Sequence, residues 1–286
     1  MITENAMQLK AKLNNKAKEL NIAPQVMLQN YIMECFLERL SKSEYADKFI
    51  IKGGILIASL VGLSNRSTMD IDTTVKNFPL KEYEISKIIS YVCGVKNDDD
   101  FSFRLERIAP IREDDEYQGI RAFLIVDYER IHNTLTIDIT TGDSIFPEAE
   151  EHKFSKIFDN EQFSLFSYPL ETVLAEKLET ILSRNVTTTR PRDFYDVYVL
   201  SAKPVNFTNL KNALELTCKH RKSEIVLTQI PEIISAIKES KNLSAQWKSY
   251  AKKMPYASEI SFEQTLGKVE ALLKKSILAR AFRGEL

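Results

Sequence analysis

The sequence predicts an α+β protein in which a mixed sheet is flanked by helices, with helices before the sheet and a helical region after it. Apolar residues recur at helical spacing near the start of the chain and again from residue 170 onward. Between these regions, residues 101–141 alternate apolar and polar side chains with a period of two, which is typical of strands. We therefore divide the chain into N-terminal helices (1–48), a central sheet domain (49–168) and a helical C-terminal domain (169–286).

Composition indicates an ordinary soluble globular protein. Apolar residues make up 44% of the 286 residues and charged residues 28%. We find no run of 18 or more apolar residues and no signal-peptide pattern at the start. The three cysteines are far apart and lack CxxC spacing, which argues against a disulfide framework and against structural zinc. We expect a reduced, cytoplasmic protein with no membrane partner.

The net charge of −1 is unevenly divided along the chain. From residue 203 onward, 12 lysines and 3 arginines face 8 glutamates, which gives +7 and leaves −8 for residues 1–202. This division favours a metal and a nucleotide in the first part and an anionic polymer on the second. The alternative is a chance distribution over two solvated surfaces.

The basic residues of the C-terminal part form two clusters, and two aromatic residues lie near the second cluster. Trp247 and Tyr250 could stack on unpaired bases of an RNA. The alternative is that both are core residues and that the lysines only keep a helical domain soluble. The clustered basic residues are Lys219, Arg221, Lys222, Lys248, Lys252 and Lys253.

Two helices are expected before the sheet. Residues 4–20 carry Leu9, Leu13 and Leu20 at helical spacing, and Pro24 suits the first turn of a second helix that runs to residue 40. We interpret both helices as packing elements.

The stretch from residue 52 to 75 contains the main chemical motif. Gly53 and Gly54 precede a helix-length apolar run, a polar turn and then two aspartates in the order Asp70-Ile71-Asp72. In a strand, Asp70 and Asp72 share one face, and two such carboxylates suit Mg²⁺, which takes carboxylate and phosphate oxygens. Glycines at the entry to a helix let backbone N–H groups approach a phosphate. Together these features predict a nucleoside triphosphate site.

Residues 121–128 and 134–140 both read as strands, and the short link between them predicts an antiparallel hairpin. If the second of these strands lies beside the strand with Asp72, Asp138 becomes a third carboxylate of the metal site and can take a proton from an attacking hydroxyl. The alternative is an exposed aspartate on a polar strand face. We interpret the acidic run 98–100 as a turn, because it lacks the spaced ligands of a calcium loop.

Two predicted helices after residue 169 carry charges on faces that are otherwise apolar. Lys177 falls within the apolar stripe of the first helix, where it must either extend its amine to water or meet anions. Asp193 and Asp196 lie three residues apart on the second helix, which is apolar almost all round, so they need partners. The nearest cations along the sequence are Lys177, Arg190 and Arg192.

The motifs KGG, RSTMDID, TIDITTGD, AEKLETILSR and RPRDFYD follow one another between residues 20 and 200. This combination resembles the AbiEii/AbiGii toxin family, the nucleotidyltransferase toxins of type IV toxin–antitoxin systems within the DNA polymerase β-like superfamily. The resemblance implies a polymerase-β-like palm, an NTP substrate, a Mg²⁺ cofactor and nucleotide transfer to an acceptor. Members of the family are associated with abortive phage defence and with a DNA-binding antitoxin encoded alongside, and some modify the 3′ end of tRNA.

The resemblance also assigns roles to residues. The implied metal ligands are Asp70 and Asp72. Many members of the family rely on only two palm carboxylates, so Asp138 as a third ligand or base rests on the predicted strand placement alone. The implied nucleotide contacts are Gly53, Gly54, Lys177 and Asp196, and Asp193 or Asp196 is the essential acid that orients Lys177 or the nucleotide. Relatives often have Ser or Thr after the glycines, whereas this chain has Ile55, so further phosphate contacts are expected from the turn at Arg66, Ser67 and Thr68.

The expected reaction is attack of an acceptor hydroxyl on the α-phosphorus of an NTP, with pyrophosphate leaving and RNA, in particular tRNA, as the acceptor. Two alternatives fit the same residues: an enzyme that adenylylates a partner protein, and a catalytically inactive nucleotide-binding module. The intact pair of aspartates, together with Lys177 and Asp193, disfavours the inactive module.

Overall fold

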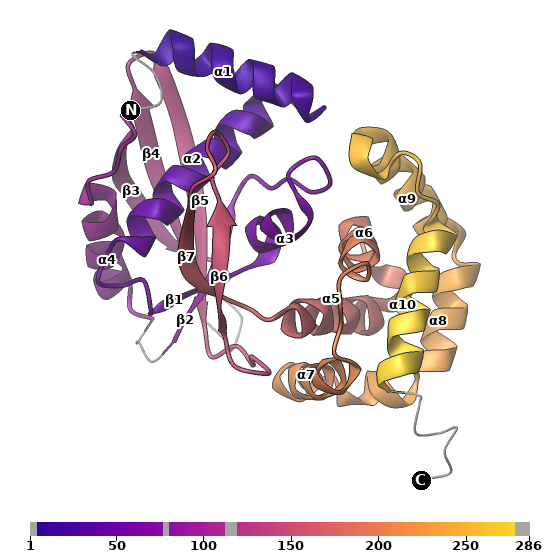
Figure 1. Cartoon of the computed structure of the whole chain (residues 1–286). Helices are drawn as coiled ribbons and strands as arrows, with labels where there is room; N and C mark the ends of the chain where they lie inside the picture. Colours follow the sequence, from indigo (N-terminus) through magenta and orange to yellow (C-terminus); the bar gives the residue numbers. More distant parts are fainter. Residues whose placement is uncertain (1–4, 77–79, 112–118, 278–286) are drawn as a thin grey trace. The chain divides into compact units, whose positions relative to one another are not determined.

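The computed structural model describes residues 5–76, 80–111 and 119–277, which form two compact units (Figure 1). The first unit comprises residues 1–143 and 150–167, and the second comprises residues 144–149 and 168–286. The N-terminal helices, which we expected as a segment of their own, belong to the first unit.

The first unit is built on a mixed seven-stranded sheet with the strand order β3-β4-β5-β2-β1-β7-β6. The pairs β2–β5 and β1–β7 are parallel, and the other neighbouring strands are antiparallel. This arrangement confirms the predicted α+β class. The strands are β1 (Phe49–Lys52), β2 (Ile71–Val75), β3 (Ser102–Pro110), β4 (Ile120–Tyr128), β5 (Ile131–Thr141), β6 (Glu150–Ser155) and β7 (Gln162–Ser167).

The predicted hairpin is confirmed by β4 and β5, which pair antiparallel from Ile120 opposite Ile139 to Tyr128 opposite Ile131. The predicted neighbour is also correct, because β5 lies next to β2 and Asp138 stands opposite Asp72. The sequence analysis did not identify β6 and β7. Their residues are mostly exposed or half-buried, so they lack the regular apolar alternation that predicts a strand.

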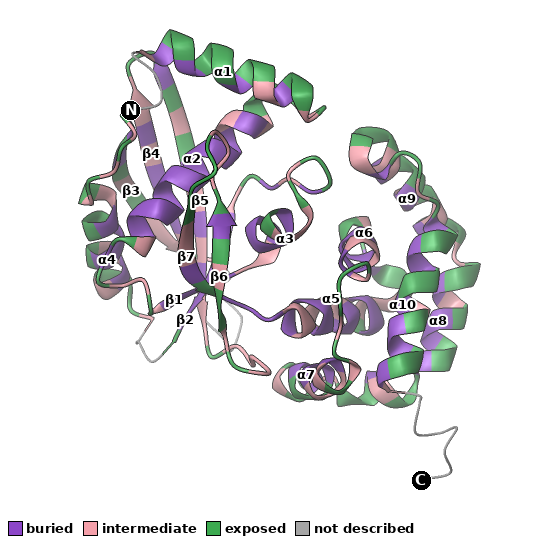
Figure 2. Cartoon of the chain, in the orientation of Figure 1, coloured by how far each residue is buried: buried purple, intermediate pink, exposed green. Residues whose placement is uncertain are grey.

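Helices α1 (Ala6–Glu19), α2 (Pro24–Ser41), α3 (Gly53–Val61) and α4 (Glu82–Gly94) complete the first unit. Figure 2 shows that α2 is buried along almost its whole length, where it packs against α1, α4, β5 and β7. The acidic run 98–100 is a turn and not a calcium loop, since the buried carboxylate of Asp99 accepts a hydrogen bond from Arg39 Nη2 at 2.8 Å. The turn therefore ties the end of α2 to the start of β3.

In its described residues the second unit consists of helices and the loops that connect them, and residues 144–149 are one such loop segment. It contains α5 (Leu170–Arg184), α6 (Pro191–Leu200), α7 (Phe207–His220), α8 (Ile230–Glu239), α9 (Lys241–Lys253) and α10 (Phe262–Ser276). Helix α5 packs against α6 and α7, and α10 packs against both as well. Within the residues described in both units, no helix is long and apolar enough to cross a membrane.

Candidate active site

The glycine pair brings the start of α3 against the side chain of Asp72. Gly53 has a φ of +64°, and a Cβ atom added to it would lie 2.0 Å from Asp72 Oδ2. A Cβ on Gly54 would lie 2.6 Å from the hydroxyl oxygen of Thr68. The Gly54 N–H donates to Asp72 Oδ2 at 3.3 Å. Only glycines allow this approach, because any side chain would fill the space that the carboxylate and the hydroxyl occupy.

Replacing Gly53 with alanine is therefore expected to destabilise the protein by about 1–3 kcal/mol, because the left-handed backbone is strained for alanine and Asp72 must move. The matched control is Gly267→Ala in α10, where nothing lies within 4 Å of the added atom. This control should be neutral or more stable by up to about 1 kcal/mol, as alanine favours a helix. Urea unfolding of both variants checks this, and equal stabilities would contradict the close approach.

Four charged side chains form one row across neighbouring strands. The register aligns Lys52 on β1 with Asp72 on β2, Asp72 with Asp138 on β5, and Asp138 with Arg121 on β4. Paired residues of neighbouring strands project to the same side of a sheet, so the two carboxylates stand side by side with one cation at each end. The row is the central feature of the candidate site in the first unit.

Asp138 is held by a bidentate ion pair that the sequence analysis did not anticipate. Arg121 Nε and Nη2 donate to the two carboxylate oxygens of Asp138 at 2.6 and 2.7 Å. Both hydrogen bonds to Asp138 raise the pKa of Arg121 above its ordinary value. The bidentate pair uses one lone pair of each carboxylate oxygen, and each oxygen keeps a second, so Asp138 can still accept a metal or a proton beside Arg121. The Arg121 side chain is 40% exposed. The catalytic role of Asp138 stays a prediction.

The surroundings of Asp72 disfavour the charged form of its carboxylate. Burial raises its pKa, and the nearby charge of Asp70 raises it further, while the Gly54 N–H and Lys52 act in the opposite direction. Two carboxylates that disfavour each other's charge would be relieved by a cation, and Mg²⁺ is commonly bound through one or two carboxylates plus substrate phosphates. Within the described ranges, no group of three or more His, Cys, Asp or Glu side chains could hold a metal ion. The Asp70–Asp72 pair therefore fits Mg²⁺ only if phosphate or water completes the shell.

In the turn before β2, two of the three residues expected to contact phosphate are hydrogen-bonded to the protein itself. The Thr68 hydroxyl is buried and donates to Asp70 Oδ1 at 2.6 Å, so it positions a carboxylate. Arg66 is only 2% exposed, and its guanidinium bonds to the backbone carbonyl of Ser67. Ser67 itself is half-buried. Nucleotide contacts by these residues stay predictions.

Lys52 and its partners were also missed. Lys52 Nζ donates to the Thr140 hydroxyl at 2.7 Å and forms an ion pair with Asp143. The signal was present in the motifs KGG and TTGD, which supply Lys52 and Asp143. The sequence does not show, however, that the ends of β1 and β5 meet.

In the second unit, Lys177 forms ion pairs with both aspartates of α6. The sequence analysis named this lysine as a candidate partner. Lys177 Nζ lies 2.7 Å from Asp193 Oδ1 and 3.0 Å from Asp196 Oδ2. Arg190 Nε adds a contact of 3.2 Å to Asp193 Oδ2. Burial lowers the pKa of Lys177, but the two carboxylates outweigh burial, so the pKa is raised and the amine stays charged. Lys177 is therefore a member of a buried ionic cluster.

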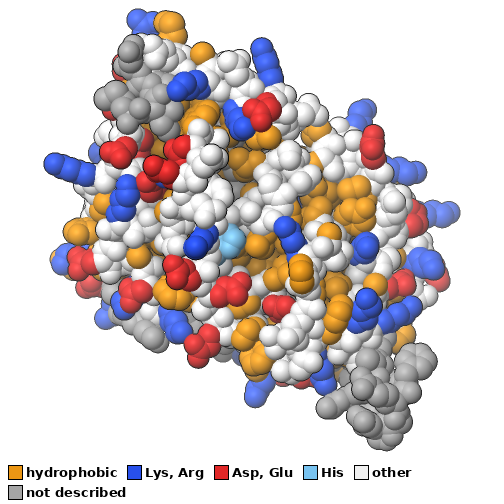
Figure 3. All heavy atoms as spheres, in the orientation of Figure 1, with side chains coloured by type: hydrophobic (Ala, Val, Ile, Leu, Met, Phe, Trp, Pro, Cys, Tyr) orange, Lys and Arg blue, Asp and Glu red, His pale blue; other side chains and the backbone are white. Residues whose placement is uncertain are grey.

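The aromatic residues near the basic cluster belong to the core of the second unit, so the expectation that they stack on bases is wrong. Trp247 is 3% exposed, and its Nε1 donates to the backbone carbonyl of Ile260 at 2.8 Å. Tyr250 is 9% exposed and contacts Trp247. The lysines Lys248, Lys252 and Lys253 are exposed. Figure 3 shows that basic side chains prevail over the part formed by α8–α10, with acidic ones between them.

The sheet topology and the carboxylates beside a glycine-led helix define a nucleotidyltransferase fold. Two solved structures from Helicobacter pylori share it. A putative nucleotidyltransferase has a TM-score of 0.52 and 14% identity, over 90% of this chain and 97% of that one. The protein JHP933 has a TM-score of 0.53 and 13% identity, over 92% and 96%. A comparison with curated proteins found none that matches.

The particular family follows from the sequence itself. Residues 35–268 match the family described as nucleotidyl transferase AbiEii toxin of type IV toxin–antitoxin systems. The chain belongs to this family, which confirms the resemblance drawn from its motifs.

Proposed function

We propose that the protein transfers a nucleotide from an NTP to a hydroxyl of an RNA acceptor, with the 3′ end of tRNA as the expected target. The observation that carries this proposal is the contact of Asp72 with the glycine-led start of α3, beside Asp70 and Asp138. Backbone N–H groups at a helix start suit phosphate, and the carboxylates suit the metal that accompanies phosphate. Membership of the AbiEii family supports a transferase of this class.

Asp70 and Asp72 would hold Mg²⁺, which supplies positive charge to the phosphoryl oxygens of the bound NTP. The chain's own residues would do the positioning. Gly53 and Gly54 leave the backbone at the start of α3 open to the phosphates, and Thr68 fixes the orientation of Asp70 through its hydroxyl. The acceptor oxygen forms a bond to the α-phosphorus, the bond to pyrophosphate breaks, and the hydroxyl proton passes to a base. Asp138 remains the candidate base, through the lone pairs that its bonds to Arg121 leave open.

Lys177 is the proposed phosphate contact of the second unit. Asp193 and Asp196 would hold its amine charged and fixed in direction, which suits a cation that must meet a phosphate without reorganising. We further propose that the protein acts in phage defence and that a DNA-binding antitoxin encoded alongside controls it. Both points rest on the family.

Incubating the purified protein with each labelled NTP, Mg²⁺ and total cellular RNA tests the donor and the acceptor in one gel. The proposal expects label in RNA of tRNA length, lost when Mg²⁺ is chelated. Label on a protein band would favour the alternative enzyme that modifies a partner. Label on neither, with NTP binding retained, would favour the inactive nucleotide-binding module.

RNA binding by the second unit gives a separate prediction. Reversing Lys252 and Lys253 to glutamate is expected to weaken tRNA binding by about tenfold and to flatten its salt dependence, because contacts to phosphates release counterions. The matched control reverses Lys10 and Lys18, two exposed lysines of α1, with the same change in net charge. Fluorescence anisotropy with labelled tRNA across a salt series measures both. Equal effects of the two double variants would leave the C-terminal part without an RNA site.

A further inference from the structure

The first unit contains a cavity that the proposed reaction does not use. Its volume is about 230 Å³, and it lies between α1, α2, α3 and the residues of β6 and β7. A water molecule takes about 30 Å³ of liquid volume, so this space has room for a small organic ring. Apolar side chains supply most of its wall. Among them, the rings of Phe154 and Phe163 are stacked with their centroids 5.5 Å apart.

Asn30 of α2 lines this cavity and carries an unsatisfied acceptor. The residue is only 2% exposed. Its amide nitrogen donates to the carbonyl of Val26 at 2.7 Å and to that of Thr68 at 3.1 Å, which uses both donors. Its Oδ1 atom has no hydrogen-bond partner among the described residues. A buried acceptor without a donor costs about 1–3 kcal/mol, so a ligand that brings an N–H group to it gains that amount.

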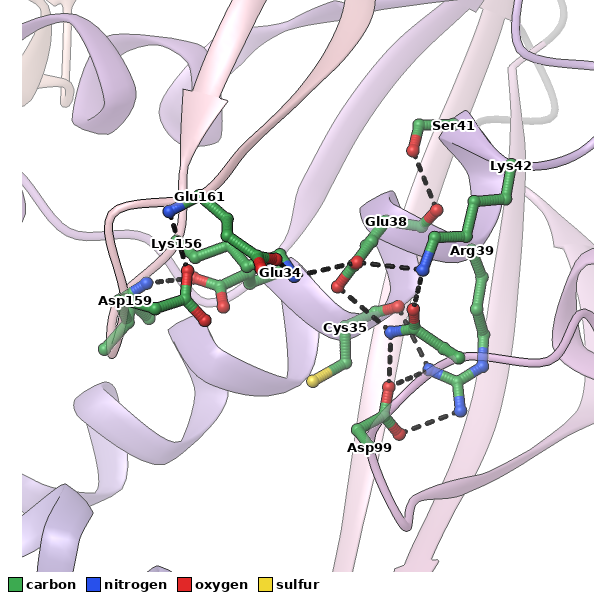
Figure 4. A network of polar contacts seen from close by, with 12 residues as sticks. Glu34, Cys35, Glu38, Arg39, Ser41, Lys42, Asp99, Lys156, Asp159 and Glu161 are labelled. Atoms are coloured by element: carbon green, nitrogen blue, oxygen red, sulfur yellow. Dashed lines mark hydrogen bonds and ion pairs between the residues drawn. The ribbon is translucent and has the colours of Figure 1, made fainter. Parts of the chain in front are cut away.

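Glu34 adds a buried carboxyl group one helical turn further along α2, on the same face as Asn30. Its Oε2 atom accepts a hydrogen bond from the Ile157 N–H at 2.7 Å. No ion pair involves Glu34 in the described part of the chain, and Figure 4 shows that the nearby Lys156 contacts Glu38 and Glu161 instead. The cavity therefore holds a carboxyl group that forms no ion pair among the described residues, because the nearest lysine is engaged by two other carboxylates.

Burial and the neighbouring carboxylates disfavour the ionised form of Glu34. Burial raises the pKa of Glu34 to about 8, and the carboxylates of Glu38 and Asp159 act in the same direction. The Ile157 N–H and Lys156 act in the opposite direction. Two lysines also line the cavity, and each is paired with another carboxylate: Lys16 of α1 lies 2.8 Å from Glu19, and Lys156 contacts Glu38 and Glu161. A cation that enters the cavity would find an acceptor on Asn30 and, on Glu34, a carboxyl group without an ion pair, whose ionised form the cation would favour.

We propose that this cavity binds a small molecule with a flat apolar body and a cationic head of two or more N–H donors, such as an amidine or an aromatic amine cation. The ring would lie against the stacked phenylalanines, and the head would donate to Asn30 Oδ1 and to Glu34. A charge-assisted hydrogen bond of this kind is roughly twice as strong as a neutral one. The cationic head therefore distinguishes this ligand from neutral and anionic molecules of the same size.

The cavity is also connected to the loop that carries Asp70. The Asn30 amide donates to the Thr68 carbonyl, and the Thr68 hydroxyl donates to Asp70 Oδ1. A ligand that contacts Asn30 therefore contacts the side chain that is hydrogen-bonded to the backbone of the loop before Asp70. Any effect of the ligand on transfer rests on the proposed function, whereas binding itself does not depend on it.

Calorimetric titration of the full chain, without NTP or metal and at a pH above about 8 where the Glu34 carboxyl is ionised, tests the proposal with benzamidine as the probe. Benzyl alcohol and benzoate are the matched neutral and anionic probes of similar size. Benzamidine is expected to bind saturably and at least about tenfold more tightly than either, as expected for a bond to a charged group. Because NTP is absent, a failure to bind benzamidine says nothing about nucleotide transfer. A failed transfer assay likewise says nothing about benzamidine binding.

Three variants complete the test. Glu34→Gln should weaken benzamidine binding by about tenfold without affecting benzyl alcohol, because the amide keeps the acceptor and loses the charge. Leu63→Trp, at a half-buried position on the cavity wall, should abolish binding of every probe by filling the space. Glu82→Gln on the exposed start of α4 should change nothing. Benzamidine binding no tighter than benzoate, or unaffected by both cavity variants, would overturn the proposal.

Discussion

Replacing Asp72 with asparagine is expected to slow nucleotide transfer by about a thousandfold, which is the scale of losing one group that stabilises transition-state charge. The fold should be retained and become more stable. Burial and Asp70 raise the pKa of Asp72, so its charge opposes folding at pH values above the ordinary range of an aspartate. Asparagine removes that charge, keeps the shape, and can still accept the hydrogen bond from Gly54.

Single-turnover transfer with a labelled NTP and urea unfolding, both near neutral pH, measure the two effects. Asp98→Asn in the exposed acidic turn serves as the control, since it removes the same charge from the same unit. It should leave both the rate and the stability unchanged. An Asp72→Asn protein that transfers at the parent rate would remove Asp72 from the metal site. A large loss of stability would contradict the proposed relief of charge repulsion.

Replacing Lys177 with methionine is expected to destabilise the protein by about 3–5 kcal/mol, because it leaves two buried carboxylates without their shared cation. Asp193 is 2% exposed and Asp196 is 0% exposed, so water cannot take over the role of the amine. Urea unfolding measures the effect. The control is Lys211→Met in α7, whose partner Glu215 is half exposed, and it should cost no more than about 0.5 kcal/mol.

The triple variant Lys177→Met, Asp193→Asn, Asp196→Asn separates stability from function. It removes the three buried charges and leaves Arg190, whose side chain is 42% exposed and reaches water. Most of the lost stability should therefore return, as buried ion pairs can often be replaced by neutral groups at little cost. If Lys177 contacts phosphate, this stable variant binds NTP poorly and does not transfer. A stable triple variant with the parent's NTP affinity would show that the cluster is purely structural.

The helices and the pair Asp70 and Asp72 could be predicted because their signals are local in the sequence. The spacing of apolar residues predicts α1, α2, α4 and α5. The two-residue spacing of Asp70 and Asp72 predicts that both share one side of the chain, although β2 begins only at Ile71. The order of the motifs was sufficient to recognise the AbiEii family, which matches residues 35–268. The need of Asp193 and Asp196 for a cation was also predictable, since a helix that is apolar nearly all round must be buried.

Tertiary structure decided which charges meet. The bidentate bond between Arg121 and Asp138 depends on the register of β4 with β5, and the contact of Lys52 with Thr140 depends on the separate pairings of β1 and β5 with β2. Periodicity could not show that Trp247 is buried, because an apolar helix position can face a core or a ligand alike. The carboxyl group of Glu34 gave no signal in the sequence, since it lines a cavity only because β7 packs against α2 and brings the β6–β7 hairpin to the same wall. A one-dimensional pattern specifies which side chains share a face of their own element, whereas the partner across that face is selected by packing between segments far apart in the chain.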